Sequence, residues 1–151
     1  MANTQAMCTS FKGELLVGHH NFGTGVVRAA TTADSFKAAL YLASATINAS
    51  TTAYTVTGEV SGTNDTAGGV AVTFGTAPST SGTTAFVTPS ASITYTNVTL
   101  STAFDCVLLY NSTQSNKAVS VHIFGSQTVT SGTFTLTMPT NDASTGLIRL
   151  A

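Results

Sequence analysis

The sequence predicts an all-β, single-domain β-sandwich, jelly-roll-like, with a short N-terminal helix. Three observations indicate this fold. Thr and Ser make up 46 of the 151 residues, and threonine is β-branched, which favours strands. Short apolar stretches alternate with Gly, Ser, Asn and Pro clusters at roughly 8–12-residue spacing, as in sandwiches and jelly rolls. Since no repeat or linker divides the chain, residues 1–151 are expected to form one domain.

The N-terminal segment is the best candidate for a helix. Met7, Phe11 and Leu15 recur at every fourth position, which is the spacing of an amphipathic helix, and Gly18 is available to end it. We therefore expect residues 4–17 to be helical, and residues 1–18 to pack on the sandwich as a helical segment.

The stretch Phe36–Ala43 has apolar residues at every second position, which predicts a strand. The Thr-Ala-Asp before it could instead cap a helix, so both readings stay open, and the β-rich composition favours the strand. Further strands are expected at residues 70–74, 84–87, 93–96, 103–110, 118–124, 133–138 and 146–150.

The stretch 103–110 is apolar at nearly every position, so it is predicted to be a central strand with both faces buried. Strand alternation places four of its side chains on one face and two on the other. The first set is Phe104, Cys106, Leu108 and Tyr110, and the second is Val107 and Leu109.

Two cysteines, Cys8 and Cys106, lie far apart without the spacing of a metal or redox motif. The N-terminus has neither a basic region nor an apolar region of a secretory signal, so we expect synthesis in a cytoplasm. Buried thiols are therefore expected, with a disulfide as the alternative.

The charge pattern disfavours two classes of partner. Five basic and six acidic residues give a net charge of −1 without a cluster of either sign. Binding to nucleic acid needs a basic stripe, which the chain does not have. The longest apolar runs fall far short of the roughly 20 residues of a membrane-spanning helix. We therefore expect neither a nucleic-acid nor a membrane partner.

Residues for catalysis or metal binding are few, and we predict no catalytic, cofactor-binding or metal site. Neighbouring strand residues face opposite sides, so His19 and His20 are not expected to share a metal, and His122 lies far away in the sequence. The Gly-Thr-Gly at residues 23–25 is most simply a turn. The six carboxylates show no pairing suited to acid–base chemistry: Glu14, Asp34, Glu59, Asp65, Asp105 and Asp142.

Low charge is the most informative feature. Only 7% of the residues are Asp, Glu, Lys or Arg, whereas the surface of a free monomer typically carries roughly 25–35%. The surface must consist largely of Thr, Ser and Asn. Such a surface suits a protein whose faces are covered by copies of itself or by a partner lattice, although a threonine-rich domain with ordinary exposure is the alternative.

Several strings, taken in order, resemble small virion structural proteins of tailed bacteriophages, of the capsid decoration or cement type. The matching strings cover residues 10–22, 34–41, 52–62, 67–69, 108–112, 124–136 and 146–150. Between Gly62 and Ala67, the pair Asn64-Asp65 departs from the Gly-aromatic pair expected in this group.

The resemblance implies a non-enzymatic virion protein without a cofactor, made and assembled in the host cytoplasm. The expected function is that of a capsid cement protein, which binds the outer head surface and stabilises contacts between capsomers of the major capsid protein lattice. A homo-oligomer is expected, and local threefold axes of capsids suggest a trimer. The alternative is a tail, baseplate or fibre component that could bind carbohydrate.

Overall fold

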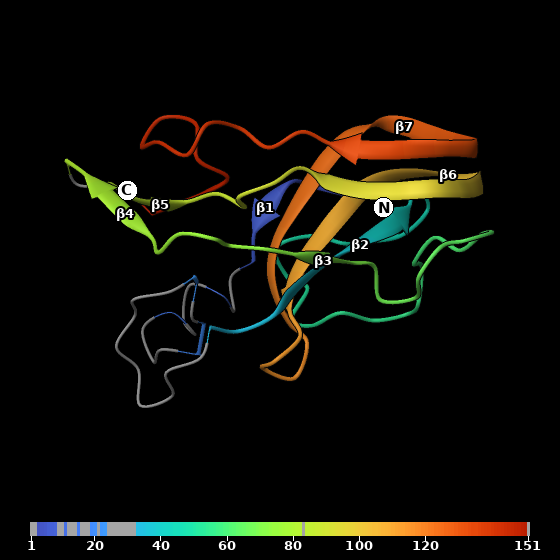
Figure 1. The fold of residues 1–151 in the computed structure, drawn as a ribbon. Coiled ribbons are helices and arrows are strands. Elements are labelled where there is room, and N and C mark those ends of the chain that lie inside the picture. Colours follow the sequence, from blue (N-terminus) through green and yellow to red (C-terminus); the bar gives the residue numbers. More distant parts are fainter. Residues whose placement is uncertain are drawn as a thin grey trace.

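The computed structural model describes residues 3–8, 11, 15, 19–20, 22–23, 33–82 and 84–150. Within these residues every named element is a strand, and the strands form two antiparallel sheets (Figure 1). The larger sheet has the order β1-β7-β6-β2-β3, and the smaller has the order β4-β5-β8. The bounds are β1 Ala6–Met7, β2 Phe36–Leu42, β3 Val70–Val72, β4 Ser79–Ser81, β5 Thr84–Val87, β6 Ile93–Asn111, β7 Lys117–Leu136 and β8 Ile148–Leu150.

The hairpin of β6 and β7 dominates the molecule, and it folds back on itself. Figure 1 shows both long strands turning back in their middle, on the right of the view. Tyr95 near the start of β6 pairs with Phe134 near the end of β7, whereas Leu108 pairs with Val121. Irregular register is confined mainly to the region between Tyr95 and Cys106. Because bulges bend and twist a strand, these irregularities place the bend there.

Left-handed backbone conformations accompany the bend on both strands. Asn97 on β6 has φ 55°, and Ser131 on β7 has φ 45°. They flank the pair of Val98 with Gly132, where regular pairing is interrupted. Asparagine tolerates this conformation better than most residues, so Asn97 turns the strand without ending it.

The core lies between the two halves of the bent hairpin and over β2. Tyr95 is buried, and its hydroxyl donates to the carbonyl oxygen of Ala38 on β2 at 2.7 Å. The ring of Phe134 meets the ring of Phe104 edge to face at 5.1 Å. These contacts join residues that are distant along the hairpin, and they bury both inner faces. The arrangement is consistent with a β-sandwich, although the strand order does not confirm a jelly roll.

Most expected strands are confirmed, but two pairs are fused. The strands predicted at 36–43, 84–87 and 146–150 correspond to β2, β5 and β8. The strands expected at 93–96 and 103–110 are halves of β6, and those expected at 118–124 and 133–138 fall largely within β7. The sequence analysis did not predict β4.

The prediction of an N-terminal helix is wrong for its first residues. Ala6 and Met7 lie in a strand, where they pair with Val121 and Ser120 at the edge of the larger sheet. Pairing along the open edge of β7 satisfies backbone groups that the helix would have paired internally. Phe11 and Leu15 have helical backbone, and the rest of the predicted helix beyond Cys8 lies outside the described residues.

The central strand has two buried faces, as predicted. Leu108 is 0% exposed and Leu109 is 1% exposed. Cys8 and Cys106 are both buried, and no disulfide joins them, so both are thiols in the structure. Burial raises the pKa of the Cys106 thiol to about 12, and Asp105 contributes in the same direction. This thiol is therefore protonated and unreactive at neutral pH.

Candidate docking surface

A row of threonines lies on the outer surface of the hairpin, near the start of β6 and the end of β7. Thr94 and Thr96 on β6 and Thr133 and Thr135 on β7 are exposed, and we call these four residues the threonine face. Thr94 lies directly opposite Thr135 across the two strands. The alternating side chains on these strands point into the core, so strand periodicity places every threonine of the set on the outside.

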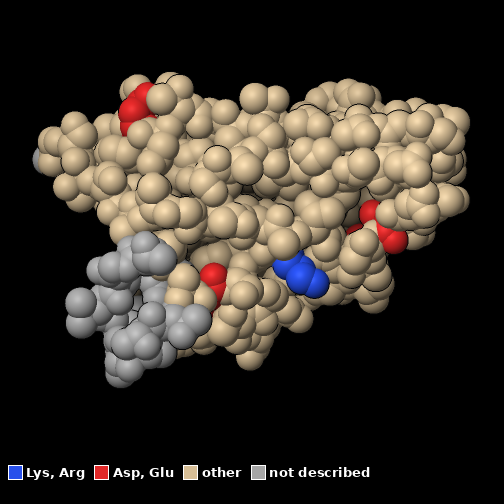
Figure 2. Space-filling view, viewed as in Figure 1, with Lys and Arg blue, Asp and Glu red and all other residues tan. Residues whose placement is uncertain are grey.

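The strand segments that carry the threonine face contain no charged side chain. The neighbouring loop brings Asp65 near one end of the face, because the Asn64 amide donates to the carbonyl oxygen of Asn97. Residues 93–104 and 118–141 contain no Asp, Glu, Lys or Arg. Figure 2 shows the consequence: charged groups are few and scattered in this view, and none lies over the upper part of β6 and β7. A threonine presents one hydroxyl and one methyl group. The face can therefore be covered by a partner without removing an ion from water.

Folding brings two of the six carboxylates together. Glu59 and Asp65 line one hollow of about 250 Å³, together with Val56 and Gly62. Burial raises the pKa of both carboxyl groups, and in Glu59 the charge of Asp65 adds to the effect. Sequence spacing did not indicate this pairing.

Glu59 is nevertheless engaged in holding a loop. Its Oε2 accepts a hydrogen bond from the Tyr54 hydroxyl at 2.6 Å, and its Oε1 accepts one from the Gly68 backbone N–H at 2.8 Å. The Tyr110 hydroxyl donates to the carbonyl oxygen of Gly68 at 2.7 Å. Because both oxygens of Glu59 have intramolecular donors, the arrangement fits a structural anchor better than an acid–base pair.

The aromatic side chains are committed to the interior. The Tyr41 hydroxyl donates to the carbonyl oxygen of Thr55 at 2.6 Å, and burial raises the pKa of Tyr41 to about 12. Tyr54 stacks on Tyr110 with ring centroids 4.9 Å apart. The chain has eight Phe, four Tyr and no Trp, all of them described, and none is fully exposed. Nine of these rings are buried, and those of Tyr54, Phe124 and Phe134 are partly buried.

A second polar cluster surrounds Asn111, which is fully buried. Its Nδ2 donates to Oδ2 of Asp34 at 2.8 Å and lies 3.2 Å from Nδ1 of His20. Gln114 donates to the other oxygen of Asp34 at 3.3 Å. These bonds connect the β6–β7 turn to the segment before β2, so the cluster has a structural explanation.

The three histidines lie in different surroundings. His20 belongs to the Asn111 cluster, and Nδ1 of His19 is buried without a hydrogen-bond partner in the described part of the chain. His122 lines a cavity inside the hairpin. Among the described residues, no group of three or more His, Cys, Asp or Glu is placed to hold a metal ion.

The remaining predicted residues do not assemble into a site. Asp105 accepts a hydrogen bond from the Asn3 amide. Asp142 accepts bonds from Ser144 and Thr145, which lower the pKa of its carboxyl group. Gly23 of the Gly-Thr-Gly has φ 75°, as a turn requires, whereas Thr24, Gly25 and Glu14 lie outside the described residues.

The sequence analysis did not single out the threonine face. The local signal was present, since Thr alternates with apolar residues at 94–96 and at 133–137. The pairing of Thr94 with Thr135 depends on the register between distant segments, which sequence alone does not give.

Comparisons with known proteins give no relative. No family model, no curated protein and no solved structure matches the chain. No helix among the described residues is long and apolar enough to cross a bilayer.

Proposed function

We propose that the chain is a non-enzymatic structural protein of a bacteriophage virion, most specifically a capsid cement protein. In this role it binds the outer surface of the head and stabilises contacts between neighbouring capsomers. The family resemblance of the sequence strings supports the proposal, and so does the presence of two antiparallel sheets. The proposal includes a jelly-roll-like topology for the sandwich.

The observation that carries the proposal is the uncharged threonine face. Thr94 and Thr135 lie opposite each other on the two paired strands, and no charged residue occurs in the flanking segments 93–104 and 118–141. A free monomer gains solubility from charge on such a surface. Covering this face with a partner protein desolvates hydroxyl and methyl groups only, and the hydroxyls can form new hydrogen bonds in the interface.

The proposed partner is the lattice of the major capsid protein. Each contact need only be modest, because a homo-oligomer that binds several capsomers at once gains avidity from every linked contact. A trimer suits the local threefold axes of a capsid, and its closed symmetry would prevent unlimited growth. The proposed location of the protein is the assembled virion.

A tail, baseplate or fibre protein is the competing assignment. In its carbohydrate-binding form it is disfavoured by the aromatic side chains, since all twelve are buried or partly buried. Sugar sites generally use an exposed aromatic face or a row of convergent polar groups.

Copy number separates the two assignments. We would purify particles of the phage that encodes this chain and count its copies by quantitative mass spectrometry, using the major capsid protein as the internal standard. Hundreds of copies per particle would support a cement protein. A few copies, up to tens, would overturn that proposal and indicate the tail, and absence from the particle would overturn both.

A further inference from the structure

A partly open cavity of about 230 Å³ lies between the two halves of the bent hairpin. One wall comes from the central strands, with Val107 and Leu109 of β6 and Ala38 of β2. The opposite wall comes from Ile93 and Leu136, at the far ends of β6 and β7. The cavity therefore lies between the layers, and the threonine face is on the outside of one of them.

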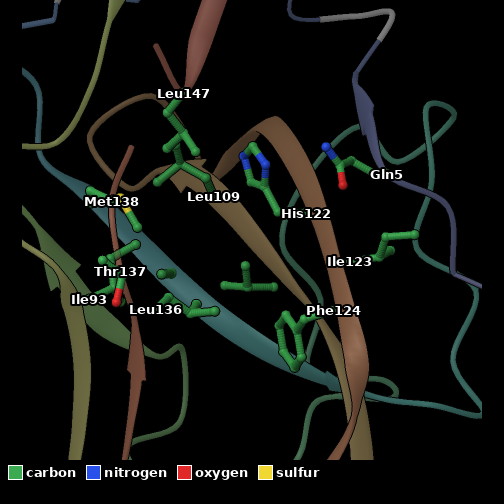
Figure 3. Close-up of a pocket in the computed structure, with 12 residues that line it drawn as sticks. Gln5, Ile93, Leu109, His122, Ile123, Phe124, Leu136, Thr137, Met138 and Leu147 are labelled. Carbon is green, nitrogen blue, oxygen red and sulfur yellow. The ribbon is translucent and has the colours of Figure 1, made fainter. Parts of the chain in front are cut away.

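The segment that follows β7 closes one end of the cavity. Figure 3 shows Met138 and Leu147 near Leu109 at that end, and Phe124 at the other. Leu147 is held by its backbone N–H, which donates to the Thr88 hydroxyl at 2.9 Å. The lining contains no Lys, Arg, Asp or Glu.

One titratable side chain lines the cavity. His122 lies on β7, and its ring projects between Leu109 and Gln5 in Figure 3. Its Nε2 is 2.8 Å from the hydroxyl oxygen of Ser120. Its Nδ1 forms no hydrogen bond within the described part of the chain. Burial lowers the pKa of His122 to about 4, so the ring is neutral at physiological pH.

We propose that this cavity is a binding site for a small neutral aromatic molecule with one hydroxyl group, about the size of a cresol. An apolar cavity of about 150 Å³ in another protein binds benzene, so the larger space here accommodates a substituted ring. Apolar walls on both layers supply contacts to the two faces of such a ring.

A hydroxyl group on the ligand would pair with Nδ1 of His122. In a neutral imidazole, one nitrogen donates a hydrogen bond and the other accepts one. The Ser120 hydroxyl can pair with Nε2 whether that nitrogen donates or accepts. Nδ1 is then an acceptor or a donor, and a ligand hydroxyl can serve in both cases. An anionic ligand is excluded from the proposal, because the lining contains no cation to compensate its desolvation.

The test uses the full chain and three probes: p-cresol, toluene and benzoate. Binding would be followed by calorimetry and by the His122 ring resonances in NMR spectra. We expect saturable binding of p-cresol, about five- to tenfold tighter than toluene because of one added hydrogen bond. We expect no saturable binding of benzoate. Absence of p-cresol binding, or equal affinity for p-cresol and toluene, would overturn the proposal.

Two variants locate the binding site. Leu136→Phe fills the cavity and should abolish p-cresol binding, whereas Val56→Phe, at an exposed position, should leave it unchanged. His122→Phe should remove the preference for p-cresol over toluene. Binding that persists in Leu136→Phe would contradict the assignment. If a variant does not fold, the unmodified chain still decides, since p-cresol at this site must shift the His122 ring resonances.

Discussion

Phe124 and Phe134 lie on the same strand, β7, yet their ring centroids are only 5.2 Å apart. In an extended strand, residues at this separation would lie roughly 33 Å apart, so the contact measures how completely β7 folds back. Phe104 of β6 contacts both rings. One bent hairpin thus supplies both layers around this part of the core, and it leaves the threonine face on the outside.

Truncation of Leu108 should test the central strand. This residue is 0% exposed and lies in the middle of the larger sheet. We expect Leu108→Ala to lower the free energy of unfolding by about 2–5 kcal/mol, because it leaves a cavity in a packed core. Chemical denaturation measures the change. The matched control is Val56→Ala, which removes a side chain that is 69% exposed; an equal loss in both variants would contradict the burial assignment.

A glycine substitution should test the close packing of the 43–69 loop against β2. A Cβ at Gly69 would lie 1.7 Å from the carbonyl oxygen of Ala38, and this glycine has φ 72°. We expect Gly69→Ala to unfold the protein or to lower its melting temperature strongly, since both space and backbone conformation oppose the side chain.

Gly125→Ala is the control for that experiment, because a Cβ there meets nothing within 4 Å and the φ is not positive. Circular dichroism during heating compares the two variants. A melting temperature of Gly69→Ala equal to that of Gly125→Ala would show that the loop does not approach β2 as described.

The stability of the protein should depend on pH in opposite ways through Glu59 and His122. Burial raises the pKa of Glu59, so the folded state binds its proton more tightly than the unfolded state does. The stabilising contribution of Glu59 is present at low pH. It is lost as the pH rises from the ordinary pKa of a glutamate carboxyl group through the raised pKa of the folded state. Glu59→Gln keeps one acceptor and should remove that loss, leaving the contribution of Asp65.

His122 acts in the other direction. Its pKa falls from 6.5 to about 4 on folding, so its contribution is present above pH 6.5 and is lost as pH falls from 6.5 to about 4. His122→Gln should remove this loss. Unfolding by urea at a series of pH values measures both variants. If both variants change the slope of the free energy of unfolding against pH in the same direction between pH 4 and 6.5, the surroundings described for Glu59 or for His122 are wrong.

The composition of the chain predicted more of its surface than of its topology. Low charge and abundant threonine predicted an uncharged polar exterior, and alternation predicted β2 and the buried pair Leu108 and Leu109. Asn97 looked like the end of a strand, but its left-handed conformation bends β6 instead. The edge strand at Met7 depends on β7, and local periodicity carries no information about such a distant partner.

Charge placed on the threonine face should prevent docking. In Thr94→Lys and Thr135→Lys, an ammonium group stands where the proposed interface would bury a hydroxyl. We expect affinity for phage heads to fall about tenfold or more, since desolvating one unpaired charge costs at least about 1.4 kcal/mol. Thr57→Lys adds the same charge at an exposed loop position and should bind normally. Equal binding by all three variants would exclude the face as the contact.

Docking to the capsid through an uncharged surface can be measured by adding the purified protein to heads that lack it. Bound copies would be counted at about 0.05 M and about 0.5 M salt, on either side of physiological screening. Contacts made by hydroxyl and apolar groups are only weakly screened. We expect saturable binding of hundreds of copies at both salt concentrations. No binding to heads, or binding that disappears at the higher concentration, would show that the protein does not dock through an uncharged surface.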